Sequence, residues 1–238
     1  MAFHAALEVR THEQFPQDWA MIQNNLGATL IEQAEQSRGL EAARLLVEAI
    51  TAIHAALEVR TREKLPQDWA MTQNCLGIAL CDQAKQSHGT EASQLLDEAV
   101  TALRAALEVT TREQFPQAWA RTQKNLGVTL IEEAKQSQEA DMAKLLAEAV
   151  VAFRAALEVI TREQFPQAWA GIQINLGSAL CNQAAHSQGI EAVHLFREGV
   201  TAYRAALEIY TADAYPDLNK LVSSNLARAE QTLHQLQK

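Results

Sequence analysis

Apolar and small side chains recur along the chain at helical spacing, and the same pattern returns every 50 residues. The first stripe is Trp19, Gln23, Leu26 and Leu30, whose separations of four, three and four residues place them on one side of an α-helix. A second stripe lies between residues 41 and 60, and it contains Leu45, Leu46, Ala49, Ile53, Ala56 and Leu57. Each 50-residue stretch therefore predicts two helices.

Proline marks the start of the first helix in each stretch. A proline occurs at positions 16, 66, 116, 166 and 216, and it suits the first helical turn, where its missing N–H would have no partner anyway. We expect this helix to end near Ser37–Gly39, because glycine is a common helix stop and recurs as Gly89 and Gly189. The segments between helices are short, so neighbouring helices must run antiparallel and pack closely.

The 50-residue periodicity organises the whole chain as a single array of repeated units. Residues 1–15 correspond to a partial first unit with a second helix only, full units follow at 16–65, 66–115, 116–165 and 166–215, and 216–238 is a more polar capping helix. The predicted fold is all-α, a single solenoid of antiparallel helix pairs over 1–238 with about ten helices. The sequence leaves open whether the chain is part of a longer array or is joined to an effector domain.

One known family shares this pattern. Leu26-Gly27-x-x-Leu30 followed by Ala49-x-x-x-Ile53-x-x-Ala56 resembles the tetratricopeptide repeat, and the Asn-Leu-Gly tripeptide is similar to versions in kinesin light chains and bacterial multi-repeat proteins. The unit is longer than the family's, which is about 34 residues, so both helices should be extended. Small residues such as Gly27, Ala49 and Ala56 would permit close approach where the helices cross. The resemblance implies a right-handed superhelix whose first helices line a concave, peptide-binding groove.

The first helices contain fixed and variable positions. Trp19, Ala20, Gln23, Leu26, Gly27, Leu30 and Ala34 hardly change between units, so we expect this side to pack, with the tryptophans in the core and the glutamines bridging helices. Positions equivalent to 21, 24, 25, 28 and 32 vary, and the resemblance implies that this stripe is the groove. Its candidate peptide-binding residues are Asn25, Asn125, Asn175, Asn225, Asn24, Asn74, Met21, Met71, Ile78, Arg121, Lys124, Val128, Ile174 and Arg228.

The asparagine before Leu-Gly persists within this variable stripe, with Cys75 as the exception. In relatives of this family that residue binds the ligand's backbone, since an amide is both donor and acceptor; the alternative is a contact within the array. Arg121 and Lys124 form a basic spot, with Lys85 and Lys135 near its edge, and Glu32, Asp82 and Glu132 form an acidic line. We therefore expect an extended, partly apolar ligand with an acidic group near Arg121 and Lys124.

The composition of the chain argues against several classes of partner and location. The net charge of −9 argues against a nucleic-acid partner, which needs a basic surface. Neither a membrane-spanning run nor a signal peptide is evident, so a cytoplasmic location is expected. Cys75, Cys81 and Cys181 do not have the spacing of disulfide partners, and they are predicted to be free thiols, buried or in the groove.

No enzyme motif, cofactor motif or metal-ligand set occurs in the sequence. His4 and His54 are expected on the surface, and His186 and His194 lack a third ligand. The favoured function is a protein-interaction scaffold that binds a peptide or a partner protein. The alternative is a structural module that forms homo-oligomers through the apolar residues Ala2, Phe3, Ala6 and Leu7 of its N-terminal half-unit.

Overall fold

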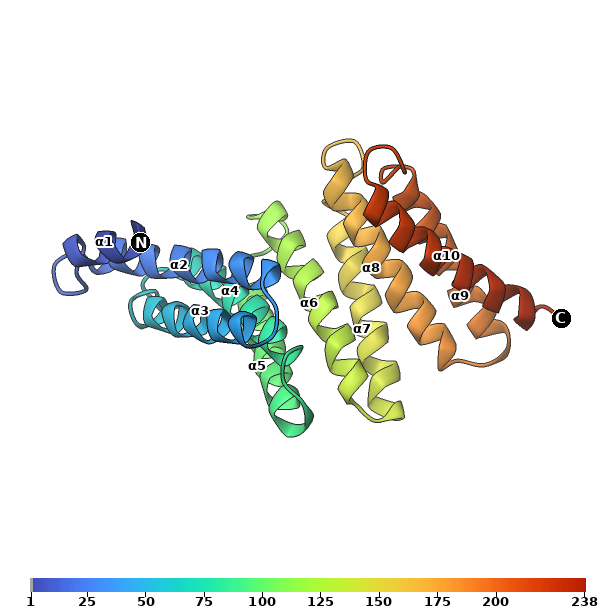
Figure 1. The fold of residues 1–238 in the computed structure, drawn as a ribbon, viewed down its shortest axis with the longest axis horizontal. Helices are drawn as coiled ribbons and strands as arrows, with labels where there is room; N and C mark the ends of the chain where they lie inside the picture. Colours follow the sequence, from blue (N-terminus) through green and yellow to red (C-terminus); the bar gives the residue numbers. More distant parts are fainter. Residues whose placement is uncertain (1) are drawn as a thin grey trace. The chain divides into compact units, whose positions relative to one another are not determined.

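The computed structural model describes residues 2–238 and is built from helices joined by short turns (Figure 1). Within these residues there are ten α-helices and no strand, which confirms the all-α prediction. The side chains of Ala2 and His4 lie outside the described part, as do the expectations that concern them. The helices are α1 (Ala2–Val9), α2 (Pro16–Gln36), α3 (Leu40–Val59), α4 (Pro66–Ala84), α5 (Gly89–Val109), α6 (Pro116–Gln136), α7 (Glu139–Leu157), α8 (Pro166–Ala185), α9 (Gly189–Leu207) and α10 (Pro216–Leu236).

The helix ends follow the local chemistry of the sequence. Helices α2, α4, α6, α8 and α10 all begin at the recurring proline, as predicted. At three of the connections between paired helices a glycine has a positive φ, which is 59° for Gly39 and 60° for Gly89 and Gly189. Residues with a side chain rarely adopt this backbone conformation. The third pair has Glu139 at the equivalent position, and no non-glycine residue of the described chain has a positive φ, so this turn is made without a left-handed residue.

The helices form two compact units, one that ends at Ala118 and one from Trp119 to Lys238. In the first unit α2 packs on α3, α3 on α4 and α4 on α5, around a core that includes Leu30, Leu46 and Leu80. In the second unit α7 packs on α8, α8 on α9 and α9 on α10. Each unit therefore consists of consecutive, mutually packed helix pairs, and the single solenoid over 1–238 stays a prediction.

Within each pair the helices cross at a glycine. A Cβ atom on Gly27 would lie 2.5 Å from Cγ1 of Ile53, and the same overlap recurs beneath the equivalent residues of the other pairs. A Cβ atom on the equivalent glycines would lie 2.5 Å from Leu103 at Gly77, 2.7 Å from Phe153 at Gly127 and 2.9 Å from Tyr203 at Gly177. The expectation that glycine permits a close crossing is thus confirmed.

Two expectations about the packed side need correction. The tryptophans are half-buried rather than core residues, and the guanidinium groups of Arg62 and Arg162 lie 5.6 Å and 5.8 Å from the ring centroids of Trp69 and Trp169. The equivalent glutamines are also half-buried, and among the described residues their side chains make no hydrogen bond, so they do not bridge helices. Partial exposure explains both results, because water can satisfy an amide and an arginine can cover an indole face.

Candidate functional site

The second unit contains a groove of about 510 Å³ that crosses three successive first helices, α6, α8 and α10. Helix α9 contributes its floor. We call it the second-unit groove, and it is lined by Val128, Ile131, Glu132, Lys135, Asn175, Ser178, Cys181, Asn182, Ala185, Phe196, Tyr203, Asn225, Arg228, Ala229 and Thr232. Most residues of α6, α8 and α10 in this set are equivalent to positions 25, 28 and 32, so the variable stripe lines a concave surface here.

The floor of the groove carries two hydroxyl groups and a thiol. Ser178 Oγ and Tyr203 Oη are 3.0 Å apart and share a hydrogen bond. Cys181 lies next to them, in space that Gly199 provides, because a Cβ atom on Gly199 would be 2.6 Å from the sulfur. Burial raises the pKa of the Cys181 thiol to about 11, so the thiol is protonated at neutral pH and is a poor nucleophile.

Tyr203 is also protonated at neutral pH. Burial raises its pKa to about 12, against the opposing effects of the hydrogen bond with Ser178 and the positive charge of Arg228. Its hydroxyl therefore acts as a neutral hydrogen-bonding group in the groove.

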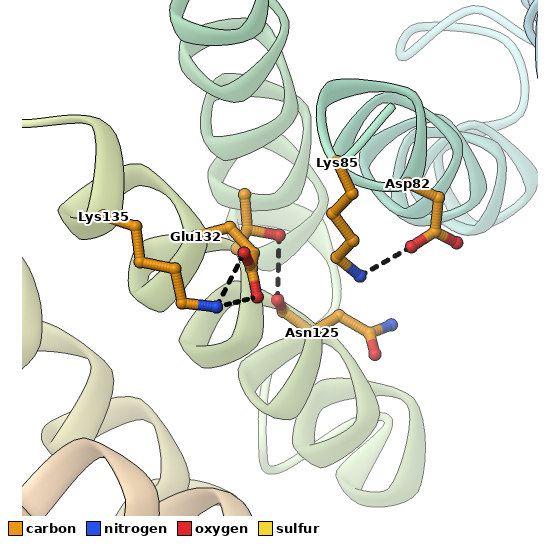
Figure 2. Close-up of polar contacts among 6 residues, drawn as sticks. Asp82, Lys85, Asn125, Glu132 and Lys135 are labelled. Carbon is orange, nitrogen blue, oxygen red and sulfur yellow. Dashed lines mark hydrogen bonds and ion pairs between the residues drawn. The ribbon is translucent and has the colours of Figure 1, made fainter. Parts of the chain in front are cut away.

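Three charged residues line the walls. Lys135 Nζ is 2.8 Å and 2.9 Å from the two carboxylate oxygens of Glu132, one helical turn away (Figure 2). Arg228 makes no side-chain hydrogen bond or ion pair with the rest of the described chain. The amides of Asn175 and Asn225 are likewise without a hydrogen-bond partner among residues 2–238. Asn182 lines the groove too, and its amide also has no partner in the described chain. The groove thus offers one uncommitted cation and three uncommitted amides.

Four of the candidate binding residues lie in this groove: Val128, Asn175, Asn225 and Arg228. The other candidates on α6 and α8 are outside its lining. Arg121 is exposed, Lys124 is half-buried, and Ile174 packs against the core of the second unit. Asn125 is only 8% exposed and is not a lining residue, so it differs from Asn175 and Asn225 although the sequence treats all three alike.

In the first unit the candidates divide between surface and core. Met21, Met71 and Asn25 are exposed, and Ile78 is half-buried against the core. Asn24 and Asn74 are 7% and 6% exposed, so their assignment to an exposed stripe is wrong. At about 100° per residue, position 24 lies only about 40° from the fully buried position 20 and belongs to the packed side. The Oδ1 atom of Asn24 is buried and has no hydrogen-bond partner among the described residues.

The acidic line expected along the first helices is partly neutralised. Lys85, the residue that follows the end of α4, has its Nζ 2.7 Å from Asp82 Oδ1, and Lys135 pairs in the same way with Glu132 within α6 (Figure 2). Both pairs have the i, i+3 spacing that favours contact on a helix surface. Lys85 and Lys135 therefore each offset the charge of one of these carboxylates.

The N-terminal surface proposed for self-association is partly covered. Phe3 packs against the core of the first unit, and Ala6 and Leu7 are half-buried. Among the described side chains of α1, the large apolar one that is exposed is Val9, with 68% of its surface accessible. The exposed apolar area is therefore smaller than the sequence suggested.

The sequence pattern did not indicate Tyr203 and Phe196 as groove residues, whereas Cys181 was expected to be buried or in the groove. Tyr203 and Phe196 come from a second helix, whereas the variable stripe lies on the first helices. A signal was present for Tyr203, because its equivalents Ile53, Leu103 and Phe153 are all apolar. A hydroxyl that appears at only one copy of an apolar position indicates a local change of environment.

Other chemistry in the described residues is sparse. In the described chain Cys75, Cys81 and Cys181 form no disulfide, in agreement with the prediction, and Cys81 is buried. Among the side chains that the structure describes, no group of three or more histidine, cysteine, aspartate or glutamate residues is arranged to bind a metal ion. None of the described helices combines the length and apolar character needed to cross a membrane.

Comparison with known proteins gives no family. No family model matches the chain, and no curated protein matches it in sequence. The fold and the groove therefore define an all-helical protein of consecutive helix pairs with a groove in its second unit.

Proposed function

We propose that this protein is an interaction scaffold that binds an extended peptide segment of a partner protein in the second-unit groove. The observation that carries the proposal is the presence of Asn175 and Asn225 in one groove, at equivalent positions of α8 and α10, with amides that no other described residue occupies. An amide offers both a donor and an acceptor, so each can pair with a main-chain N–H and C=O of a ligand.

The shape and lining of the groove favour an extended chain over a compact small molecule. The groove crosses three helices and mixes the apolar side chains of Val128, Ile131 and Phe196 with polar ones along its length. An extended segment can place alternate side chains on such apolar surface while its backbone bonds to the amides. The tetratricopeptide resemblance supports the same proposal.

Selection from a phage-displayed library of random linear peptides tests the proposal. Binding of the selected peptides is then measured by fluorescence anisotropy for the wild type and for Asn175→Ala/Asn225→Ala. We expect the double variant to bind about tenfold or more weakly, because each lost hydrogen bond contributes about 0.5–1.5 kcal/mol. Asn25→Ala is the matched control, since it removes the equivalent amide from the first unit, and it should bind as the wild type does.

Two outcomes would contradict peptide binding in this groove. The library could yield no peptide that binds above background, or the selected peptides could bind the double variant and the wild type equally. Self-association remains the alternative function, with the less support because Phe3, Ala6 and Leu7 are partly covered. Light scattering over a range of protein concentrations distinguishes it, since a monomer throughout would exclude it.

A further inference from the structure

The fourth helix pair differs from the others at two positions that meet in space. Ser178 occupies the place of Ala28, Ile78 and Val128, and Tyr203 that of the apolar residues Ile53, Leu103 and Phe153. Packing does not require these hydroxyls, because Phe153 covers Gly127 in the same manner as Tyr203 covers Gly177. The two changes introduce polar groups at one point of the groove floor.

These two hydroxyls retain hydrogen-bonding capacity. Ser178 Oγ and Tyr203 Oη are 3.0 Å apart, and a single hydrogen makes the bond between them. The hydrogen of the accepting hydroxyl is then free to point into the groove. The floor therefore presents an O–H donor to any group bound above it.

A third departure lies on the wall beside this pair. Arg228 of α10 is a cation, whereas the residues at the equivalent positions of the other first helices, Ala28, Ile78, Val128 and Ser178, are uncharged. It lines the groove with Ser178 and Tyr203, and its guanidinium has no hydrogen-bond or ion-pair partner in the described chain. A guanidinium supplies five N–H donors in a planar fork that matches carboxylate and phosphate oxygens.

The remaining charges of the groove do not oppose an anion. Glu132 is the acidic residue of the lining, and Lys135 already holds both of its oxygens at 2.8 Å and 2.9 Å. Arg228 is left as an uncompensated positive charge, although the whole chain carries a net charge of −9. The groove is thus complementary to a negative group at this point.

We infer that Arg228, Ser178 and Tyr203 form an oxyanion subsite that takes an acidic side chain, a carboxylate or a phosphate group, of the bound peptide. The inference rests on the proposed function and adds the chemistry of the partner. The arginine pairs with the oxyanion from the α10 wall, while the free hydroxyl donates to it from the floor. Asn175 and Asn225 hold the peptide backbone on either side.

A peptide selected on the wild type provides the test, synthesised in forms with glutamate, glutamine, serine or phosphoserine at its acidic position. The wild type should bind the glutamate or phosphoserine form at least about tenfold more tightly than the glutamine form, as expected for charged hydrogen bonds. Arg228→Ala should lose this preference. Arg197→Ala is the matched control, because it removes an exposed arginine of α9 that does not line the groove, and it should keep the preference.

A second variant tests the hydroxyls without threatening the fold. Ser178→Val/Tyr203→Phe copies the Val128 and Phe153 pair that already packs in the chain. It should bind the glutamine form as the wild type does and should discriminate less between glutamate and glutamine. Circular dichroism confirms that each variant is folded.

The outcomes separate this inference from the proposed function. Selected peptides that need Asn175 and Asn225 but show no acidic preference would overturn the subsite and leave peptide binding intact. An acidic preference that survives Arg228→Ala would also overturn it. If inorganic phosphate shifts the Arg228 side-chain N–H signals in NMR while the peptide shows no acidic preference, the subsite binds a free anion and not a peptide side chain. That result would overturn the inference. A library that yields no binder would overturn both proposals.

Discussion

Gly77 lies beneath Leu103 so closely that a Cβ atom on the glycine would be 2.5 Å from Cγ of the leucine. Leu103 is fully buried and cannot swing into open space. Gly77→Ala is therefore expected to lower the free energy of unfolding by about 1–3 kcal/mol, the usual cost of forcing extra volume into a packed core. Urea denaturation followed by circular dichroism measures this change.

Gly171 is the matched control for that substitution. It also lies inside a first helix, but a Cβ atom there would meet its nearest neighbour, Tyr210 Oη, at an ordinary 3.7 Å. Gly171→Ala should raise the free energy of unfolding by about 0.5–1 kcal/mol, because alanine is the better helix former. Equal effects of the two substitutions would contradict the close crossing at Gly77.

Arg60 and Asp68 form a charged pair that later units replace by neutral residues. Arg60 is buried, its Nη1 donates to Thr72 Oγ1 at 3.0 Å, and its Nη2 lies 3.8 Å from Asp68 Oδ1. In the next unit the equivalent residues are Thr110 and Ala118. Asp68→Ala alone should destabilise the chain by about 1 kcal/mol, because it leaves the charge of a buried guanidinium without its partner.

The double variant Arg60→Thr/Asp68→Ala copies that later unit, where the Thr110 hydroxyl donates to the carbonyl of Ala106 at 2.8 Å. We expect its stability in urea to return to within about 0.5 kcal/mol of the wild type, since charge and partner are removed together. Asp18→Ala is the control, because its pair with Arg10 is about half exposed and should contribute little. A double variant less stable than Asp68→Ala would refute the coupling.

Alkaline pH should destabilise the second unit through Tyr203 and Cys181. Burial raises the pKa of Tyr203 from 10.0 to about 12 and that of Cys181 from 9.0 to about 11, so the folded state keeps both groups protonated longer than the unfolded state does. Their contribution is fully present below the unfolded pKa values and is lost as the pH rises through about 9–11 for Cys181 and about 10–12 for Tyr203.

The Tyr203→Phe variant provides the measurement. Its urea midpoint should fall less than that of the wild type between about pH 8 and about pH 11, because one of the two groups that deprotonate on unfolding has been removed. The phenolate absorbance of the folded protein should also lose its most alkaline component. An identical decline in both proteins would show that Tyr203 does not titrate with unfolding.

Exposed ion pairs between the turn that follows one second helix and the end of the next second helix should matter little. Arg62 Nη1 lies 2.6 Å from Glu108, and Arg162 Nη1 lies 2.5 Å from Glu208 at the equivalent places of the other unit, with all four side chains about half exposed. Glu208→Ala is expected to change the free energy of unfolding by less than about 1 kcal/mol. High salt should abolish the difference in the same denaturation experiment. A larger, salt-independent loss would mean that Glu208 has a packing role.

Local signals predicted the helices because each depends on a few neighbouring residues. A proline opens the first helix of every pair, and Gly39, Gly89 and Gly189 adopt the turn conformation that other residues avoid. The glycine at the crossing was also predictable, since a residue without a side chain, repeated within an apolar stripe, indicates a close neighbour. The sequence did not predict which large residue of the second helix packs over each glycine, namely Ile53, Leu103, Phe153 or Tyr203.

Angles alone could not resolve the borders of the variable stripe. Position 24 lies between the packed and open sides, and only the neighbouring helices decide that Asn24 and Asn74 are buried. The same limit applies to Asn125 and Asn175, which occupy equivalent positions although one is buried and the other lines the groove. Burial depends on what packs against a residue, which repeats of the sequence do not specify.

The sequence by itself determined the all-helical fold, the pairing of helices and the stripe at positions 25, 28 and 32, because helical periodicity fixes which residues share a face. Only the tertiary structure decided where that stripe becomes a groove and which groups in it are uncommitted. Tyr203 reaches the groove floor from α9 to meet Ser178 of α8, and Arg228 joins them from α10. Such a meeting of residues from three helices depends on packing distances, which no single helix contains.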